Sequence, residues 1–418
     1  MLNINRPFLI FLKRGLFLVF FISLRLQAAV SPLQDLIENA NTGETVNLPA
    51  GTYKGQLIIS KGITLDGQNK TIIDGDGQNS VVIIDTDGAQ LRNLHITNSG
   101  SSHNNTDSCV QIKGHFNIVK DNLLDNCLIG IDLQQSNNNV VRRDKISSKP
   151  LDLGLRGDAI RLWYSNDNKV TQNDIQDARD TVVWYSKDNL ISENTATRGR
   201  YALHFMYSQT NKVEKNKYIN NSVGIFLMYS DGVEIRDNYI AHANGATGVG
   251  IGFKESGNVI VENNQILYCA SGIYLDLSPF QPDTINDIKN NQIAYNGTGV
   301  LFHNDWVGNV FKENYFKGNI SQVAVNGART ANRNVWEGNI WDDYTGFDQN
   351  KDGIGDTPYQ LYSYADQLLS DLPQTKFFKG TPLLELLNFL DQLAPFNQPV
   401  LLLQDSHPLL KKMDKKHE

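Results

Sequence analysis

LHFMYS at residues 203–208 and IFLMYS at residues 225–230 are two copies of one short pattern that belongs to a longer repeat. Related segments lie before and after this pair: IDLQQS at 131–136, IRLWYS at 160–165, TVVWYS at 181–186, IGFKES at 251–256, IYLDLS at 273–278 and VLFHND at 300–305. From Ser165 onward the closing serines lie 21, 22, 22, 26 and 22 residues apart. The longest step leaves room for a loop near residues 242–248.

This repeat predicts a coil of parallel strands. Each copy restarts with the same face inward, which excludes a hairpin meander, and the copies lack the apolar spacing of about 3.6 residues that marks a helical repeat. Asparagines bound a second short strand in each repeat, as in NKVEKNKYI, and asparagine suits tight corners and side-chain ladders. We expect an all-β fold over residues 57–345. It is a single-stranded right-handed parallel β-helix of roughly a dozen turns, a rod about 60 Å long at ~4.8 Å per turn.

The first residues differ from the rest of the chain. Arg6, Lys13 and Arg14 precede a short apolar run, and Ala28 and Ala29 follow it. A basic segment, an apolar segment too short to span a bilayer and small residues at the end are typical of a secretory signal peptide. We expect residues 1–29 to direct export and to be removed. Retention of this segment as a membrane anchor is the alternative.

The net charge argues against nucleic acid as a partner. The chain carries a formal charge of −7. The signal segment contributes Arg6, Lys13, Arg14 and Arg25 and no acidic residue, so its removal gives −7 − 4 = −11. An acidic protein repels the phosphate backbone.

Both ends of the coil need covers, because open strand edges pair with other chains. Residues 30–56 are expected to form an N-terminal cap with a small helix within residues 31–40. The asparagine pattern stops after Tyr359. We interpret residues 346–360 as an acidic closing loop and residues 361–418 as a partly helical C-terminal cap or docking segment, with an amphipathic helix over residues 382–393.

Three cysteines, Cys109, Cys127 and Cys269, remain after removal of the signal segment. An odd number in an exported protein argues against a disulfide framework. Cys127 and Cys269 are expected to be buried structural thiols about six turns apart. Cys109 falls in a different register, where we expect it to be exposed.

Strand alternation predicts which side chains leave the core. In IDLQQS, Asp132 and Gln134 cannot face the interior, so the first and third residues of every copy must. The second and fourth residues then form outward columns. One outward column contains Trp163, Trp184, Met206 and Met228, and the neighbouring column contains His204 and Phe226. Four tyrosines at the strand ends form a further ladder, which we interpret as structural: Tyr164, Tyr185, Tyr207 and Tyr229.

Two interpretations fit this apolar strip. His204, Met206 and Met228 offer an imidazole and two thioethers, a soft donor set that favours Cu(I). Alternatively, the strip packs against a partner or against the C-terminal segment, with Trp163, Trp184 and Phe226 as partner-binding residues. The two interpretations are compatible, because a metal donor must dock its acceptor near the metal.

DQNKDGIGDTPY at residues 348–359 is a second local signal. It places Asp348, Asn350, Asp352 and Asp356 at the spacing of an EF-hand calcium loop, but Tyr359 stands where the bidentate glutamate belongs. The loop predicts either a structural site for calcium or another hard cation, or a set of Asx turns that closes the coil.

Three segments together resemble the NosD family: RGRYALHFMYS at residues 198–208, IFLMYS at 225–230 and GNIWDDYTGFDQNKDGIGDTPY at 338–359. The resemblance runs from the signal segment to about Tyr359 and continues loosely beyond it. It implies a periplasmic, non-enzymatic accessory protein that acts with a membrane-embedded ABC-type transporter and associates with the membrane through it. It also implies delivery of copper, or of sulfur, to the copper–sulfur centre of nitrous oxide reductase. The family supplies no ligand set, so His204, Met206 and Met228 rest on strand geometry.

A carbohydrate-active enzyme on the same scaffold, a lyase, hydrolase or epimerase of an acidic polysaccharide, is the rival class. Fold does not exclude it. A glycosidase needs two carboxylates beside one groove, whereas the outward columns of this sheet hold the isolated Asp132 and Asp276. Asp276 with Lys254 and Tyr274 is the best local cluster, and it also fits a surface ion pair.

Overall fold

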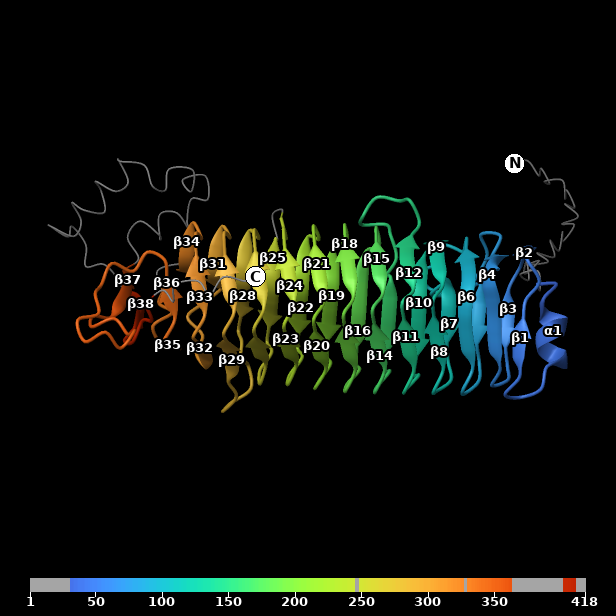
Figure 1. The fold of residues 1–418 in the computed structure, drawn as a ribbon, viewed down its shortest axis with the longest axis horizontal. Helices are drawn as coiled ribbons and strands as arrows, with labels where there is room; N and C mark the ends of the chain where they lie inside the picture. The colour runs from blue at the N-terminus through green and yellow to red at the C-terminus, as the bar shows by residue number, and fades with distance from the viewer. Residues whose placement is uncertain (1–30, 245–247, 327–328, 363–400, 411–418) are drawn as a thin grey trace, which may run out of the picture.

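A computed structural model describes residues 31–244, 248–326, 329–362 and 401–410. The chain is a parallel β-solenoid of about 13 turns, drawn out as a straight rod with α1 at one end and β37 and β38 at the other (Figure 1). The described residues contain a single α-helix, α1 (Gln34–Asn39). No helix in the described ranges is long and apolar enough to cross a membrane. The predicted fold class is confirmed.

Each turn contributes one strand to a sheet of 12 parallel strands, which we call the site sheet. Its strands, in spatial order, are β3 (Leu57–Ile59), β5 (Val82–Ile84), β7 (Ser108–Ile112), β10 (Ile129–Gln134), β13 (Ile160–Trp163), β16 (Asp180–Trp184), β19 (Tyr201–Met206), β22 (Val223–Met228), β25 (Val249–Lys254), β28 (Ser271–Asp276), β31 (Thr298–Phe302) and β34 (Ser321–Val325).

The other two faces of the coil form one sheet of 24 strands. It begins with β1 (Thr45–Asn47), β2 (Gly51–Lys54), β4 (Thr64–Asp74) and β6 (Gln90–Thr97). One row then consists of β8 (Ile118–Lys120), β11 (Val140–Arg142), β14 (Lys169–Thr171), β17 (Leu190–Ser192), β20 (Lys212–Glu214), β23 (Glu234–Arg236), β26 (Ile260–Glu262), β29 (Asn286–Lys289), β32 (Asn309–Lys312) and β35 (Val335–Glu337). The other row consists of β9 (Leu123–Cys127), β12 (Lys145–Ser148), β15 (Asp174–Gln176), β18 (Thr195–Thr197), β21 (Lys217–Ile219), β24 (Tyr239–Ala241), β27 (Gln265–Leu267), β30 (Gln292–Ala294), β33 (Tyr315–Lys317) and β36 (Ile340–Trp341).

The inward positions of the site sheet are apolar and buried, as alternation predicts. Leu203, Ile225, Ile251, Ile273 and Val300 pair in register from strand to strand, and all are fully buried. Burial of apolar area at about 25 cal/mol per Å² is the main stabilising contribution of such a core.

Asparagine recurs because it forms a buried ladder at the corner between the two rows of short strands. From Asn173 to Asn314, each side-chain Nδ2 donates to Oδ1 of the asparagine one turn further on, at 2.9–3.0 Å. The members are Asn122, Asn173, Asn194, Asn216, Asn238, Asn264, Asn291, Asn314 and Asn339, with Asp144 standing between the first two. The ladder satisfies polar groups that would otherwise be buried without partners.

The ends of the coil are closed by short elements. At the first turn, α1 buries Ile37. At the last turn, β37 (Tyr359–Tyr362) pairs antiparallel with β38 (Leu401–Asp405), and Asp405 Oδ2 accepts from Asn339 Nδ2 at 3.0 Å, which terminates the ladder. The signal peptide and the helix predicted over residues 382–393 lie outside the described residues.

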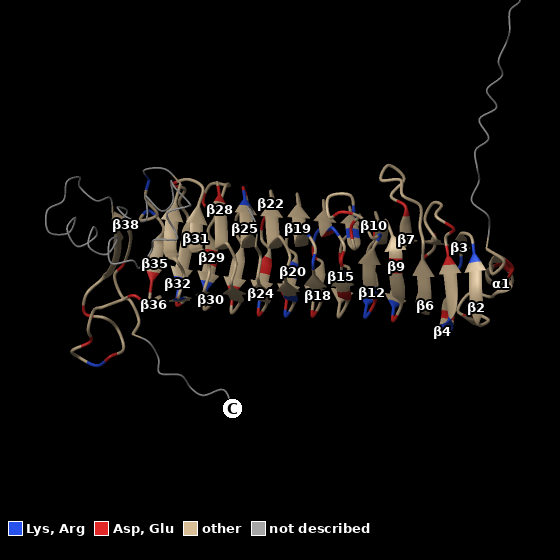
Figure 2. Ribbon diagram, turned by 90° about the horizontal axis from the view of Figure 1, so that it is seen from above, with Lys and Arg blue, Asp and Glu red and all other residues tan. Residues whose placement is uncertain are grey.

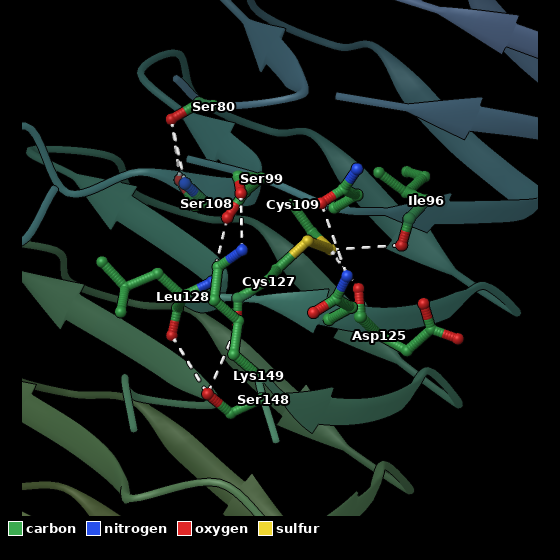
Figure 3. The surroundings of a disulfide bond; sticks show 12 residues. Ser80, Ile96, Ser99, Ser108, Cys109, Asp125, Cys127, Leu128, Ser148 and Lys149 are labelled. Atoms are coloured by element: carbon green, nitrogen blue, oxygen red, sulfur yellow. Dashed lines mark hydrogen bonds between the residues drawn. A yellow bond between two sulfur atoms is a disulfide. The ribbon is translucent and has the colours of Figure 1, made fainter. Parts of the chain in front are cut away.

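The expectation for the cysteines was wrong for two of the three. Cys109 and Cys127 form a disulfide, with Cα atoms 5.5 Å apart (Figure 3). Cys109 is fully buried on β7 rather than exposed. An odd number of cysteines is compatible with a disulfide, because one bonded pair and one free thiol also give three. The coil also brings together residues that lie less than one turn apart in the sequence. Cys269 is free and buried, as expected.

Candidate functional site

The site lies on the outward face of the site sheet. Register pairs Trp163 with Trp184, Trp184 with Met206, and Met206 with Met228, so these four residues form one column as predicted. All four are partly exposed. His204 pairs with Phe226 in the neighbouring column.

His204 points away from the coil but is largely covered, with 8% of its surface exposed. Its Nε2 atom lies 3.1 Å from Met228 Sδ. The Tyr201 ring stacks on the imidazole at 4.8 Å between centroids, and Trp184 approaches edge-on at 6.4 Å. The expectation of an open, solvent-facing column therefore holds for the sulfur-bearing residues and is wrong for His204, because large rings on the same face cover it.

Burial lowers the pKa of His204 to about 4, with Arg200 acting in the same direction and Asp180 opposing it. The imidazole is therefore neutral near pH 7. Its Nδ1 atom is buried and has no hydrogen-bond partner. If Nδ1 carries the proton, the Nε2 lone pair faces the thioether lone pairs. If Nε2 carries it, the donor meets a weak sulfur acceptor.

This donor set fits a soft cation. A neutral imidazole nitrogen and a thioether sulfur already converge, and Met206 lies beside Met228 in the adjacent strand. Thioether and imidazole ligands select Cu(I) over hard ions such as Mg²⁺ or Ca²⁺. In the described ranges, no three His, Cys, Asp or Glu side chains come together where they could hold a metal.

A charged network holds Tyr201 over His204. Asp180, which is buried, accepts from Arg200 Nε at 3.0 Å and from the Tyr201 backbone N–H at 3.1 Å. The Arg200 guanidinium lies over the Tyr201 ring, 4.9 Å from its centroid. Sequence reasoning missed these three residues. The available signal was the spacing, since Arg200 follows Asp180 by 20 residues, close to one repeat.

The column is flanked by further aromatic contacts. Arg161 lies over both the Trp163 and Trp184 rings, at 5.8 and 5.9 Å. Phe226 packs over Gly252, where a Cβ atom would come within 2.4 Å of the ring. The predicted tyrosine ladder is confirmed, with successive stacked rings 4.8, 5.2 and 4.9 Å apart from Tyr164 to Tyr229.

Comparison with known proteins identifies the family. Residues 137–346 match the family described as "Periplasmic copper-binding protein (NosD)", about half of the chain. The chain belongs to the NosD family.

Two relatives support this assignment over most of the chain. One is the "Probable ABC transporter binding protein NosD" of Stutzerimonas stutzeri, 26% identical over an alignment of 399 residues that covers 87% of this chain and 86% of the relative. The second, of the same description, is from Pseudomonas aeruginosa and is 24% identical over 92% of each chain. The NosD family is periplasmic by its description.

Solved structures resemble this NosD-family chain in fold. The A-module of the mannuronan C-5 epimerase AlgE6 from Azotobacter vinelandii aligns with a TM-score of 0.57 at 16% identity, over 72% of this chain and 92% of that one. A mannuronic-acid-specific family 6 polysaccharide lyase from human gut microbiota aligns with a TM-score of 0.54 at 14% identity, over 86% of this chain and 97% of that one. At such identities the likeness shows the β-helix alone.

The acidic loop of this NosD-family chain forms Asx turns. Asp348 accepts from the backbone of Asp352 and Gly353, and Asp352 accepts from Ile354 at 2.8 Å. Asn350 accepts from Asp352, and Asp356 accepts from Gln349. The side chains therefore bond their own loop, and the geometry favours the turn-closing interpretation over calcium.

Within the described ranges, the cluster of Asp276, Lys254 and Tyr274 lacks the ion pair that its residues suggested. Lys254 and Asp276 are register neighbours, yet they form no ion pair in the part of the chain that the structure describes. The Lys254 ammonium instead lies 6.0 Å from the centroid of the Tyr229 ring.

Proposed function

We propose that this NosD-family protein binds Cu(I) through His204, Met206 and Met228 and supplies it for maturation of nitrous oxide reductase. The observation that carries the proposal is the contact of 3.1 Å between His204 Nε2 and Met228 Sδ. The family's copper-binding description and the transporter-binding names of the two relatives support it.

Each residue has a separate task in this proposal. His204 supplies a nitrogen donor that burial keeps unprotonated, so protons compete little for it near neutral pH. Met206 and Met228 supply uncharged sulfur donors, which hold a univalent soft ion without trapping harder divalent ions. Tyr201 keeps the imidazole in position and shields it from water.

The same proposal assigns partners and a compartment. The acceptor, nitrous oxide reductase, docks on the partly exposed strip containing Trp163, Trp184 and Phe226, next to the cargo. The ABC-type transporter contacts residues 382–393 of the C-terminal segment and attaches the protein to the membrane. A disulfide between Cys109 and Cys127 suits the oxidising periplasm, to which the signal peptide would export the chain.

Copper binding is tested by titrating the metal-free protein with Cu(I) against a competing chelator. We expect tight binding by the native chain. Because loss of an outer-shell residue already costs roughly 10–100-fold in metal affinity, removal of the ligands in a His204→Ala, Met206→Ala, Met228→Ala variant should cost at least ~100-fold.

The matched control is His303→Ala. It also removes a histidine, but His303 directly follows β31 of the same sheet and so lies several turns away from the proposed site. Its affinity should equal that of the native chain. If the triple variant keeps the native affinity, the ligand assignment is wrong.

Docking is tested by pull-down with two variants. Trp184→Asp should lose the reductase and keep the transporter, because a charge enters the apolar strip. Replacing residues 363–400 with a two-residue Asn-Gly turn should abolish binding of the transporter and leave binding of the reductase intact. Register pairs Tyr362 with Leu401, so this turn can join β37 to β38 and preserve the Asp405 cap. Retention of both partners by both variants would contradict the proposal.

A further inference from the structure

A groove of about 690 Å³ lies on a different face, toward the N-terminal end of the coil. Its floor follows one column of outward positions in which register pairs Ile72 with His95, His95 with Leu123, and Leu123 with Lys145. The strands that contribute are β4, β6, β9 and β12, which are neighbours in Figure 1. The volume lies in the range of about 300–1,000 Å³ that is usual for small-molecule sites.

One wall of the groove is an overhang in β4. Asp66 pairs with Arg92, and the next pair joins Thr71 to Leu94. Between these two pairs β4 advances by five residues, whereas β6 advances by two. The extra residues, 68–70, are exposed and end in Lys70, which lines the groove. These extra residues supply a side wall of the groove.

The overhang is held rigidly. The Asp66 carboxylate accepts from Gln68 N at 2.8 Å, Asn93 Nδ2 at 2.9 Å and Arg92 Nε at 2.8 Å. Gly67 packs so closely that a Cβ atom there would lie 2.4 Å from Leu94 Cδ2. The wall is therefore preformed, which lowers the entropic cost of binding a ligand.

The groove is cationic although the protein is acidic. Lys70, Arg143 and Lys145 line it together with one carboxylate, Asp121, and basic residues appear in blue at the ends of β9 and β12 (Figure 2). Arg143 is bonded to Asp121 at 2.7 and 2.8 Å. Lys70 and Lys145 are exposed and form no ion pair with any described residue. Two positive charges are thus left for a ligand.

A histidine faces the same groove in a fixed orientation. His95 Nε2 bonds to Asp125 Oδ2 at 2.9 Å, which leaves Nδ1 without a hydrogen bond within the described residues. Leu123, 41% exposed, lies next to it on the floor. The groove therefore combines an apolar floor, one oriented polar ring and cationic ends.

We propose that this groove binds an elongated molecule with oxyanion groups, carboxylate or phosphate, near both ends. Lys70 and Lys145 lie about three turns apart, or roughly 14 Å along the coil at ~4.8 Å per turn. That length and the apolar floor fit a carboxylated sugar oligomer of about three units; an inorganic polyphosphate has the same end groups. This site is separate from the copper proposal and does not depend on it.

The test is calorimetric titration of the full chain with two probes, a trimer of a uronic acid and a linear inorganic polyphosphate long enough to reach from Lys70 to Lys145. We expect at least one to bind, more weakly at high salt because exposed charges are screened. Binding of the trimer alone assigns a sugar ligand, and binding of the polyphosphate assigns a phosphate ligand. A Lys70→Gln, Lys145→Gln variant should bind at least ~10-fold more weakly, a loss of about 1.4 kcal/mol, because both ends of the ligand lose a charged contact.

Lys217→Gln is the matched control. Lys217 is exposed and belongs to the same column as Lys145, through Asp174 and Thr195, but lies outside the groove. The affinity of the Lys217→Gln variant for the probe should equal that of the native chain, and all variants should have the native melting temperature. The proposal is overturned if neither probe binds, if the double variant binds normally, or if the control loses as much affinity.

Discussion

Replacing Asp144 by asparagine is expected to raise the apparent melting temperature at pH 7 to 8 by roughly 5 °C. Asp144 occupies a position in the asparagine ladder. Its Oδ1 atom accepts from Asn122 Nδ2 at 2.9 Å, as an asparagine would, but its buried Oδ2 atom has no partner. An asparagine there would place an amide N–H toward Asn173 Oδ1, in the way that Asn173 donates to Asn194.

The effect has a defined pH dependence. Burial, reinforced by Asp121, raises the pKa of Asp144 to about 7, from a usual value of about 4. A raised pKa means that the native state keeps a proton that the unfolded state releases. The associated stability is fully present below about pH 4 and is lost as the pH rises to about 7. This loss is on the order of 4 kcal/mol.

Thermal unfolding of both proteins across pH 4 to 8 measures this. The difference between Asp144→Asn and the native chain should grow with pH and level off above pH 7. Asp405→Asn is the opposite control, because Asp405 ends the ladder and accepts only N–H groups, from Gly338, Asn339, Trp341 and His407. That variant should melt lower. If the melting temperature of the native chain changes with pH in the same way as that of the Asp144→Asn variant, the stability loss assigned to Asp144 is wrong.

Removing the disulfide is expected to lower the free energy of unfolding by about 3 kcal/mol. Cys109 and Cys127 are separated by 18 residues and are both fully buried. Closing a loop of that length restricts the unfolded chain, and a Cys109→Ala, Cys127→Ala variant loses this restriction together with some core packing. Denaturant unfolding with and without reductant measures the change.

The control is Cys269→Ala, which removes the free thiol and leaves the cross-link. Reductant should destabilise the native chain and the Cys269→Ala variant but not the double variant. In denaturant without reductant, the mature native chain should present one reactive thiol. Three reactive thiols would show that the bond does not form.

Periodic features were predictable from the residues, because in a β-helix the number of residues between two positions determines how far apart they lie. Residues one repeat apart lie in adjacent strands, so the column from Trp163 to Met228 and the tyrosine ladder followed from counting. The same count placed Leu203 and Ile225 in the core. Corner asparagines were also predictable, since their amides bond along a ladder.

Aperiodic features were not predictable in this way. The disulfide joins residues less than one turn apart across a corner, and the overhang of β4 interrupts the repeat. Asp405, which ends the asparagine ladder, lies 66 residues after Asn339 in the sequence. The acidic loop illustrates the same limit. Its spacing suits calcium and Asx turns equally, and the backbone conformation favours the turns.

The pattern of apolar residues thus accounts for the strands, their register and the face on which each side chain lies, because alternation and repeat length are local properties of the chain. How deeply an outward side chain is covered depends on neighbours from other turns. His204 demonstrates the distinction. Its column could be predicted from the repeat. Its cover by Tyr201 and Trp184, the lowered pKa that burial produces and its contact with Met228 exist only once the turns have stacked.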